Sequence, residues 1–292
     1  MARCLVTGHK GYIGAHLSRR LEEMGHEVLG IDLQLHDKDV IKELKEDNVG
    51  LFHPHYADFK PEYLFHLACF PRVEYSVENP VETMLNNVMA TSVALNFAYK
   101  VGVKRFVYSS SSSVVGNGDG PTNPYALQKY ASELEVKLYS ELYGMDTVSL
   151  RYFNVYSEDQ KAESAYATAV ANYMKHIREG KKPFITGDGE QRRDMAHVLD
   201  VVSANIFAME YEDRFGGRYF DVGTGENISL NEIKEIVQAH HPDVEFDYVE
   251  ERKGDVLVTL ADITPLAELG WTPQVSVAQG IGECFLNTKR NE

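Results

Sequence analysis

A tyrosine and a lysine stand four positions apart, shortly after a run of five serines. The run is Ser109 to Ser113, and the pair is Tyr125 and Lys129. Four positions are about one helical turn, so both side chains lie on one face of the helix expected over residues 123–144. A free phenol titrates at about pH 10, and an adjacent ammonium group favours the phenolate. The pair is therefore suited to removing a proton from a substrate hydroxyl group.

Three glycines follow the first apolar run at intervals of three. Gly8, Gly11 and Gly14 come after the strand expected at "RCLVTG" and open an amphipathic helix. Glycine permits a tight turn and a close approach of the backbone to a pyrophosphate at a helix N-terminus. Asp32 ends the next expected strand, where its carboxylate would accept hydrogen bonds from the ribose of adenosine. Leucine and glutamine follow it rather than arginine, which favours NAD over NADP.

The elements that must position these residues alternate along the first half of the chain. We expect strands at 3–8, 26–32, 63–68, 105–110 and 146–156, and helices at 14–25, 37–47, 80–102 and 123–144. Such alternation predicts an α/β fold, a Rossmann-type doubly wound parallel sheet, over residues 1–156. Residues 157–292 read as a smaller α+β region that binds substrate, some segments of which can return to the first domain. Its expected helices are 166–180, 200–211 and 229–241, and its strands 183–187, 218–223 and 244–250.

Composition limits the possible functions. The net charge of −15 over 292 residues argues against a nucleic-acid partner, which requires a basic face. Three cysteines without metal-ligand spacing predict no metal site and a reduced cytoplasm. We expect no membrane association, because no apolar stretch reaches about 18 residues and the N-terminus lacks a signal-peptide pattern.

The spacing G-x-x-G-x-x-G, within "TGHKGYIG", resembles the extended branch of the short-chain dehydrogenase/reductase superfamily. The resemblance implies a strand that ends in serine and a Y-x-x-x-K pair on the next helix. The catalytic residues implied are Ser111, Tyr125 and Lys129, with Ser113 as the alternative serine. Ser111 would lie beside the phenol and share the proton of the substrate hydroxyl.

Further motifs carry the resemblance along most of the chain: "FHLAC", "MLNNV", "LRYFNVY", "GDGEQRRD" and "ERKGDV". The NAD-binding residues that it implies are Gly8, Gly11, Tyr12, Ile13, Gly14, Asp32, Leu67, Ala68, Asn86, Ser109, Tyr125, Lys129, Tyr152 and Phe153. The substrate-binding residues that it implies are Ser111, Tyr125, Asn154, Arg193, Arg252, Asp255 and Thr259. Neither Asp37 nor Asp58 is assigned to adenine, and His66 is interpreted as structural.

These motifs are similar to those of nucleotide-sugar 4-epimerases of the UDP-glucose/UDP-galactose type. Dehydratases of this branch carry an Asp-Glu pair after the strand, where this chain has serines. The resemblance implies NAD as cofactor, a UDP-hexose as substrate, and a homodimer through the helices at 80–102 and 123–144. Small Thr259 would also admit N-acetylated sugars. The alternatives are a UDP-glucuronate or UDP-N-acetylhexosamine 4-epimerase, or a non-catalytic NAD-sensing protein.

Overall fold

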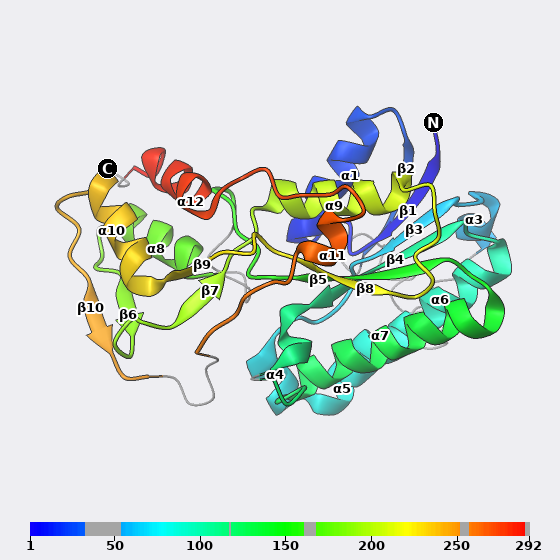
Figure 1. Ribbon diagram of the computed structural model, residues 1–292, viewed down its shortest axis with the longest axis horizontal. Helices are drawn as coiled ribbons and strands as arrows, with labels where there is room; N and C mark the ends of the chain where they lie inside the picture. Colours follow the sequence, from blue (N-terminus) through cyan, green and yellow to red (C-terminus); the bar gives the residue numbers. More distant parts are fainter. Residues whose placement is uncertain (33–53, 117, 161–167, 252–256, 290–292) are drawn as a thin grey trace. The chain divides into compact units, whose positions relative to one another are not determined.

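Short apolar runs of the sequence become buried strands of a six-stranded sheet in the computed structural model (Figure 1). The structure describes residues 1–32, 54–116, 118–160, 168–251 and 257–289. The sheet has the order β2-β1-β3-β4-β5-β8, and β1 pairs in parallel with both β2 and β3. The strands are β1 (Arg3–Thr7), β2 (Glu27–Ile31), β3 (Tyr63–His66), β4 (Arg105–Ser111), β5 (Thr147–Tyr152) and β8 (Tyr219–Val222). The predicted Rossmann-type fold is confirmed.

The described chain forms two compact units. Unit 1 comprises residues 1–114, 121–151 and 202–220, and unit 2 comprises residues 115–120, 152–201 and 221–292. The chain leaves unit 1 briefly after Val114 and again after Arg151, a few residues before the expected boundary at 156, and it returns to unit 1 at residues 121 and 202. Residues 202–220 supply most of α9 (Val198–Glu210) and the start of β8.

Helices cover both faces of the sheet in unit 1, with α1 and α9 on one face and α6 and α7 on the other (Figure 1). The helices are α1 (Tyr12–Glu23), α3 (Pro54–Asp58), α4 (Val73–Glu78), α5 (Pro80–Met84), α6 (Ala90–Val101) and α7 (Pro124–Tyr143). α7 begins where the Asn123 side chain accepts a hydrogen bond from the Ala126 amide, and it ends at Gly144, whose φ of 66° suits glycine. The expected helix at 37–47 lies outside the described residues.

The single helix expected at 80–102 is divided into α5 and α6 by a π-helical turn at Leu85–Met89. Asn87 in this turn is buried, and its side chain holds the backbone of Phe70 at both polar groups, accepting from N–H at 2.6 Å and donating to C=O at 3.1 Å. The π-turn thus places an amide against the segment that follows β3. Periodicity alone could not reveal this interruption.

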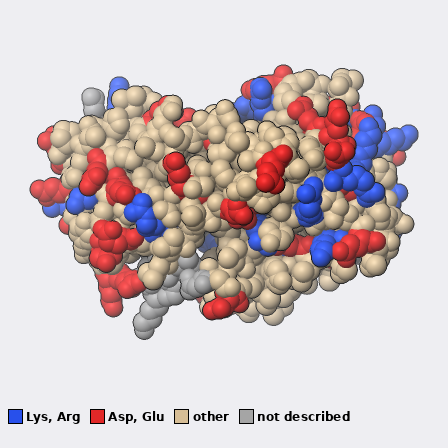
Figure 2. All heavy atoms as spheres, viewed as in Figure 1, with Lys and Arg blue, Asp and Glu red and all other residues tan. Residues whose placement is uncertain are grey.

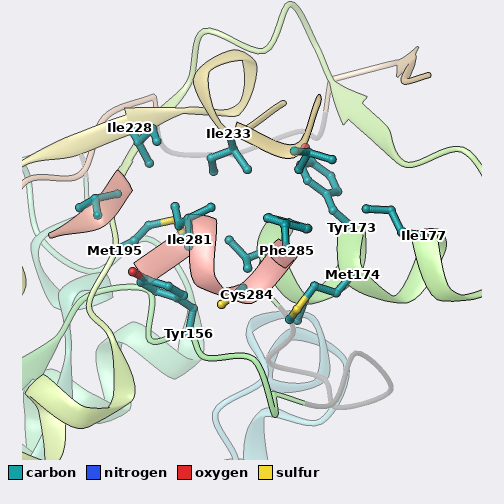
Figure 3. Packing of buried hydrophobic residues seen from close by; sticks show 14 of the residues in the cluster. Tyr156, Tyr173, Met174, Ile177, Met195, Ile228, Ile233, Ile281, Cys284 and Phe285 are labelled. Atoms are coloured by element: carbon teal, nitrogen blue, oxygen red, sulfur yellow. The ribbon is translucent and has the colours of Figure 1, made fainter. Parts of the chain in front are cut away.

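Unit 2 is built around an apolar cluster to which helices α8, α10 and α12 contribute (Figure 3). Its helices are α8 (Ala169–Arg178), α10 (Leu230–His240), α11 (Thr264–Ala267) and α12 (Val277–Leu286). Its strands form two pairs: β6 (Phe184–Thr186) with β10 (Asp247–Val249), and β7 (Arg192–Asp194) with β9 (Asn227–Ser229). Strands β7 and β9 and helix α12 were not predicted, because short polar strands and a glycine-containing helix give weak periodic signals.

Candidate functional site

The glycine loop between β1 and α1 packs backbone against backbone. A side chain on Gly8 would meet the Ala68 amide nitrogen at 2.8 Å, and one on Gly14 would meet the Gly8 carbonyl oxygen at 2.1 Å. Gly8 also has a φ of 75°, a conformation that glycine adopts without strain. The backbone packing of this loop therefore requires glycine at both positions for the tight turn from strand to helix.

This loop presents the start of a 12-residue helix. α1 begins after Gly11, no side chain caps it, and its first turn carries no acidic residue. The partial positive charge of the helix N-terminus is therefore not neutralised by the first turn and suits a phosphate group. The loop lies where β1 has β2 on one side and β3 on the other, which is the switch point of the sheet.

Asp32 lies directly after β2, as the sequence predicted. Its carboxylate accepts a hydrogen bond of 2.9 Å from the backbone amide of Lys10 in the glycine loop. The contact holds the carboxylate beside the loop that would carry a pyrophosphate, which is the position that ribose recognition requires. The loop glycines, the uncapped helix and Asp32 together fit a dinucleotide.

Tyr125 and Lys129 lie on the inner face of α7 and are almost fully buried, at 8% and 2% exposure. The Lys129 Nζ donates a 2.6 Å hydrogen bond to the Ser109 carbonyl and lies 4.9 Å from the centre of the Tyr108 ring. The Ser111 hydroxyl at the end of β4 contacts the Tyr125 phenol. The structure thus brings the three predicted catalytic residues together in unit 1.

Burial dominates the electrostatics of this cluster. It raises the pKa of the Tyr125 phenol, while the Lys129 ammonium and the Ser111 hydroxyl act to lower it. Burial also opposes protonation of Lys129, but the neighbouring Cys69 thiol and the two phenols raise the pKa of its amine overall. The ammonium therefore supplies the positive charge that the phenolate needs, although by itself it does not offset the desolvation of Tyr125.

The serine run has an ordered structure. Ser113 donates to the Ser111 hydroxyl from both its own hydroxyl, at 3.0 Å, and its backbone amide, at 3.2 Å. Ser111 is thus the serine of the pair that contacts the phenol, and Ser113 supports it from the following turn. This geometry favours Ser111 over Ser113 as the residue that meets a substrate.

His66 has both ring nitrogens engaged. Nδ1 lies 2.7 Å from the Thr7 hydroxyl, and Nε2 lies 3.2 Å from the Thr91 hydroxyl. Complete burial and the nearby Lys129 ammonium lower the pKa of the imidazole to about 3. A neutral ring with two hydroxyl partners agrees with the structural interpretation of His66.

The structure distinguishes two adjacent asparagines. Asn86, the predicted NAD contact, is half-buried on the π-turn and donates a 2.8 Å hydrogen bond to the Glu82 carbonyl. Asn87 is the buried partner of Phe70 and also donates to Gln128 at 2.7 Å. Asn87 and Gln128 hold the segment after β3, which carries Leu67 and Ala68, against α7. This role was not predicted, because the resemblance assigned a function only to Asn86 within "MLNNV" and none to Gln128 within the Y-x-x-x-K segment.

In unit 2, two of the predicted substrate residues, Asn154 and Thr259, meet beside the buried Asp194. Asp194 is fully buried and accepts hydrogen bonds from the backbone amides of Thr224, Gly225 and Ala261. Asn154 donates to the Asp194 carbonyl at 2.7 Å and to the Thr259 hydroxyl at 3.3 Å. Asp194, which was not predicted, therefore anchors the loops that carry these side chains.

Further predicted residues fall into two groups. Tyr152 and Phe153 are buried where unit 2 begins. Arg252 and Asp255 lie outside the described residues, as does Asp37.

Arg193 and Asn154 line a pocket of unit 2 with a volume of about 190 Å³. Side chains from α8, β6 and the start of α10, among them Tyr173 and Phe184, complete it together with Gln191 before β7. The buried Tyr173 hydroxyl has no hydrogen-bond partner among the described residues. A pocket with aromatic walls, amide groups and one guanidinium suits a planar heterocycle joined to an anionic group.

The surface agrees with the acidic composition. On the face shown in Figure 2, basic side chains of the described residues are interspersed with acidic ones and form no continuous basic area. Within the described ranges, no helix combines the length and the apolar character needed to cross a membrane.

The chain is similar to known proteins in both sequence and structure. Residues 4–223 match the model of the NAD dependent epimerase/dehydratase family. A UDP-glucose 4-epimerase of Mycolicibacterium smegmatis is 34% identical, with 96% of each chain covered. The solved structure of a UDP-N-acetylglucosamine 4-epimerase from Methanobrevibacter ruminantium, in complex with UDP-N-acetylmuramic acid, is 29% identical. It superposes with a TM-score of 0.85 over 98% of this chain and 96% of its own.

A UDP-glucose 4-epimerase from Thermus thermophilus, solved in complex with NAD, is 27% identical, with a TM-score of 0.83 over 98% of this chain and 99% of its own. The predictions of the family and of its cofactor are thereby confirmed. With the glycine loop, the Tyr-x-x-x-Lys pair and a family match over most of its length, the chain belongs to the NAD-dependent epimerase/dehydratase family.

Proposed function

We propose that this protein is a UDP-hexose 4-epimerase that inverts C4 through a transient 4-keto sugar. Tyr125 takes the proton from the 4-hydroxyl group and later returns it, and Ser111 shares that hydrogen bond. The glycine loop, the start of α1 and Asp32 would hold NAD, which would supply reversible hydride transfer at C4. The observation that carries the proposal is the buried Lys129 ammonium. Lys129 lies on the same helical face as Tyr125 and donates a hydrogen bond to the Ser109 carbonyl.

The residues beside the base support epimerisation over elimination. Removal of water from a sugar requires an acid and a base next to the keto group, and the positions after Ser111 are serines. Ser113 bonds to Ser111 and lacks the carboxyl group that elimination needs. The cluster therefore supplies one proton carrier, which is what a reversible oxidation and reduction at C4 requires.

The pocket in unit 2 supports a nucleotide as the part of the substrate that the protein binds there. We assign the pocket at Arg193 and Asn154 to the nucleoside diphosphate, with the guanidinium on a phosphate and the aromatic wall against the base. The relatives named above are described as UDP-sugar 4-epimerases, which supports uracil as the base.

The decisive test uses purified protein with UDP-glucose and UDP-galactose, followed by separation of the products. We expect interconversion, and Tyr125→Phe should lower turnover by about 10²–10⁴-fold while NAD remains bound. Tyr130→Phe is a matched control, because Tyr130 lies on the same helix and is 38% exposed. Absence of interconversion by the wild type would refute the substrate assignment. Near wild-type turnover in Tyr125→Phe would refute the assignment of Tyr125 as the base.

A further inference from the structure

A buried carboxylate, that of Glu133, lies on the same helical face as the proposed base. Tyr125, Lys129 and Glu133 follow one another at intervals of four on α7, and Glu133 is 6% exposed. Each of the three is bonded to the serine strand. The phenol contacts Ser111, the ammonium donates to the Ser109 carbonyl, and Glu133 accepts from the hydroxyl of the serine between them, Ser110, at 2.5 Å.

The carboxylate of Glu133 is held from the next strand as well. Arg151 on β5 donates to both of its oxygens, from Nε at 2.8 Å and from Nη2 at 2.7 Å. The guanidinium of Arg151 lies 3.5 Å from the centre of the Tyr219 ring on β8. The group Ser110–Glu133–Arg151 thus joins α7 to the ends of two adjacent strands, and all its members are less than 9% exposed.

Burying such a pair is expensive, and apolar side chains of similar volume often give equal stability. Stability alone therefore does not account for a bidentate ion pair two helical turns from the base and one turn from Lys129. We propose that Glu133 and Arg151 are positioning residues, which fix the register of α7 against the serine strand and so keep Lys129 and Ser111 in contact with Tyr125. The inference rests on the proposed function for its kinetic test only.

The same two strands carry a matched control at their other end. Arg105 begins β4, and its Nε donates at 2.6 Å to Asp146, directly before β5. Both side chains are 8% exposed. Arg105 also donates to three backbone carbonyls of residues 208–213, so this pair anchors the returning segment rather than the serine strand.

The test measures the pKa of the Tyr125 phenol by NMR of ring-labelled tyrosine, with the resonance assigned by its loss in Tyr125→Phe. The groups that face this phenol are Lys129 on its own helix, Tyr108 and Ser111 on β4, and Cys69 after β3. Glu133→Gln removes a negative charge, which by charge alone lowers the pKa of the phenol. Loss of register instead moves the ammonium away and raises that pKa.

We expect the pKa of Tyr125 to rise in Glu133→Gln, and kcat on the UDP-hexose to fall by on the order of 10²-fold with little change in KM. Arg151→Lys keeps the charge but loses the bidentate geometry, so it should act in the same direction and serves if Glu133→Gln does not fold. Asp146→Asn should lower the melting temperature and leave both the pKa of Tyr125 and kcat unchanged.

An unchanged or lowered pKa of Tyr125 in the folded Glu133 and Arg151 variants would overturn the inference. Because the NMR measurement needs no turnover, a wild type that lacks epimerase activity would refute the proposed function and leave this test intact.

Discussion

Lys129→Met is the change that most directly tests how the base works. Methionine has a similar length and removes the ammonium without leaving a large cavity. In the wild type, the Lys129 ammonium acts to lower the pKa of the Tyr125 phenol against the effect of burial. Removing it should therefore raise the pKa of the phenol further, and less phenolate should form at any given pH below that pKa.

The size of the effect follows from the geometry. Side chains four apart on a helix lie about 6 Å apart, and an effective dielectric constant of about 20 gives roughly 2.8 kcal/mol between unit charges. Since about 1.4 kcal/mol corresponds to one pH unit, the acidic limb of the pH–kcat profile should move upward by about two units. On that limb, turnover at fixed pH should fall by roughly a hundredfold.

The assay is the initial rate of UDP-galactose conversion from acid to alkaline pH, with the NAD content of each preparation measured in parallel. Equal NAD content separates loss of the base from loss of the cofactor, and Tyr125→Phe, which lacks the titrating group, should show no such limb. A Lys129→Met variant that retains NAD and has a wild-type acidic limb would show that the ammonium does not tune the phenol, and would refute the reasoning.

Three further predictions concern the cofactor, the assembly and the substrate. Cofactor-free protein should bind NAD more tightly than NADP in titrations, and Asp32→Ala should remove most of that preference; equal affinities in the wild type would contradict the role of Asp32. The apolar side chains of Leu134 and Leu138 on α7 are both 47% exposed, so we expect light scattering to show a dimer that forms through this helix. Changing both leucines to glutamate should convert the dimer into a monomer. A monomeric wild type would exclude this interface. Thr259→Tyr should lower kcat/KM for UDP-N-acetylhexosamines roughly 5- to 150-fold, which corresponds to about 1–3 kcal/mol of activation free energy. The same change should leave kcat/KM for UDP-hexoses unchanged. The Thr259 hydroxyl already bonds to Asn154, so this prediction depends on the small volume of the threonine side chain. A wild type that is inactive on N-acetylated sugars would contradict it.

The sequence predicted the parts of the site whose chemistry is local in the chain. The glycine loop is readable because Gly14 packs against the Gly8 carbonyl within the same loop and Gly8 has a φ of 75°. Tyr125 and Lys129 are readable because helical spacing alone places them on one face. The parallel sheet with helices on both faces also followed from the alternation of strands and helices, since such connections are right-handed crossovers.

What the sequence could not predict depends on pairs that only the fold brings together. Glu133 shares the spacing of Tyr125 and Lys129, but its partners lie 23 and 18 residues away, on β4 and β5. Asp194 collects amides from loops 30 and 67 residues further along the chain. Such groups are buried charges whose desolvation must be offset by specific partners, so their positions are set by three-dimensional packing rather than by local pattern. The residues proposed to touch substrate were therefore visible in the motifs, whereas those that hold them in place appeared only in the structure.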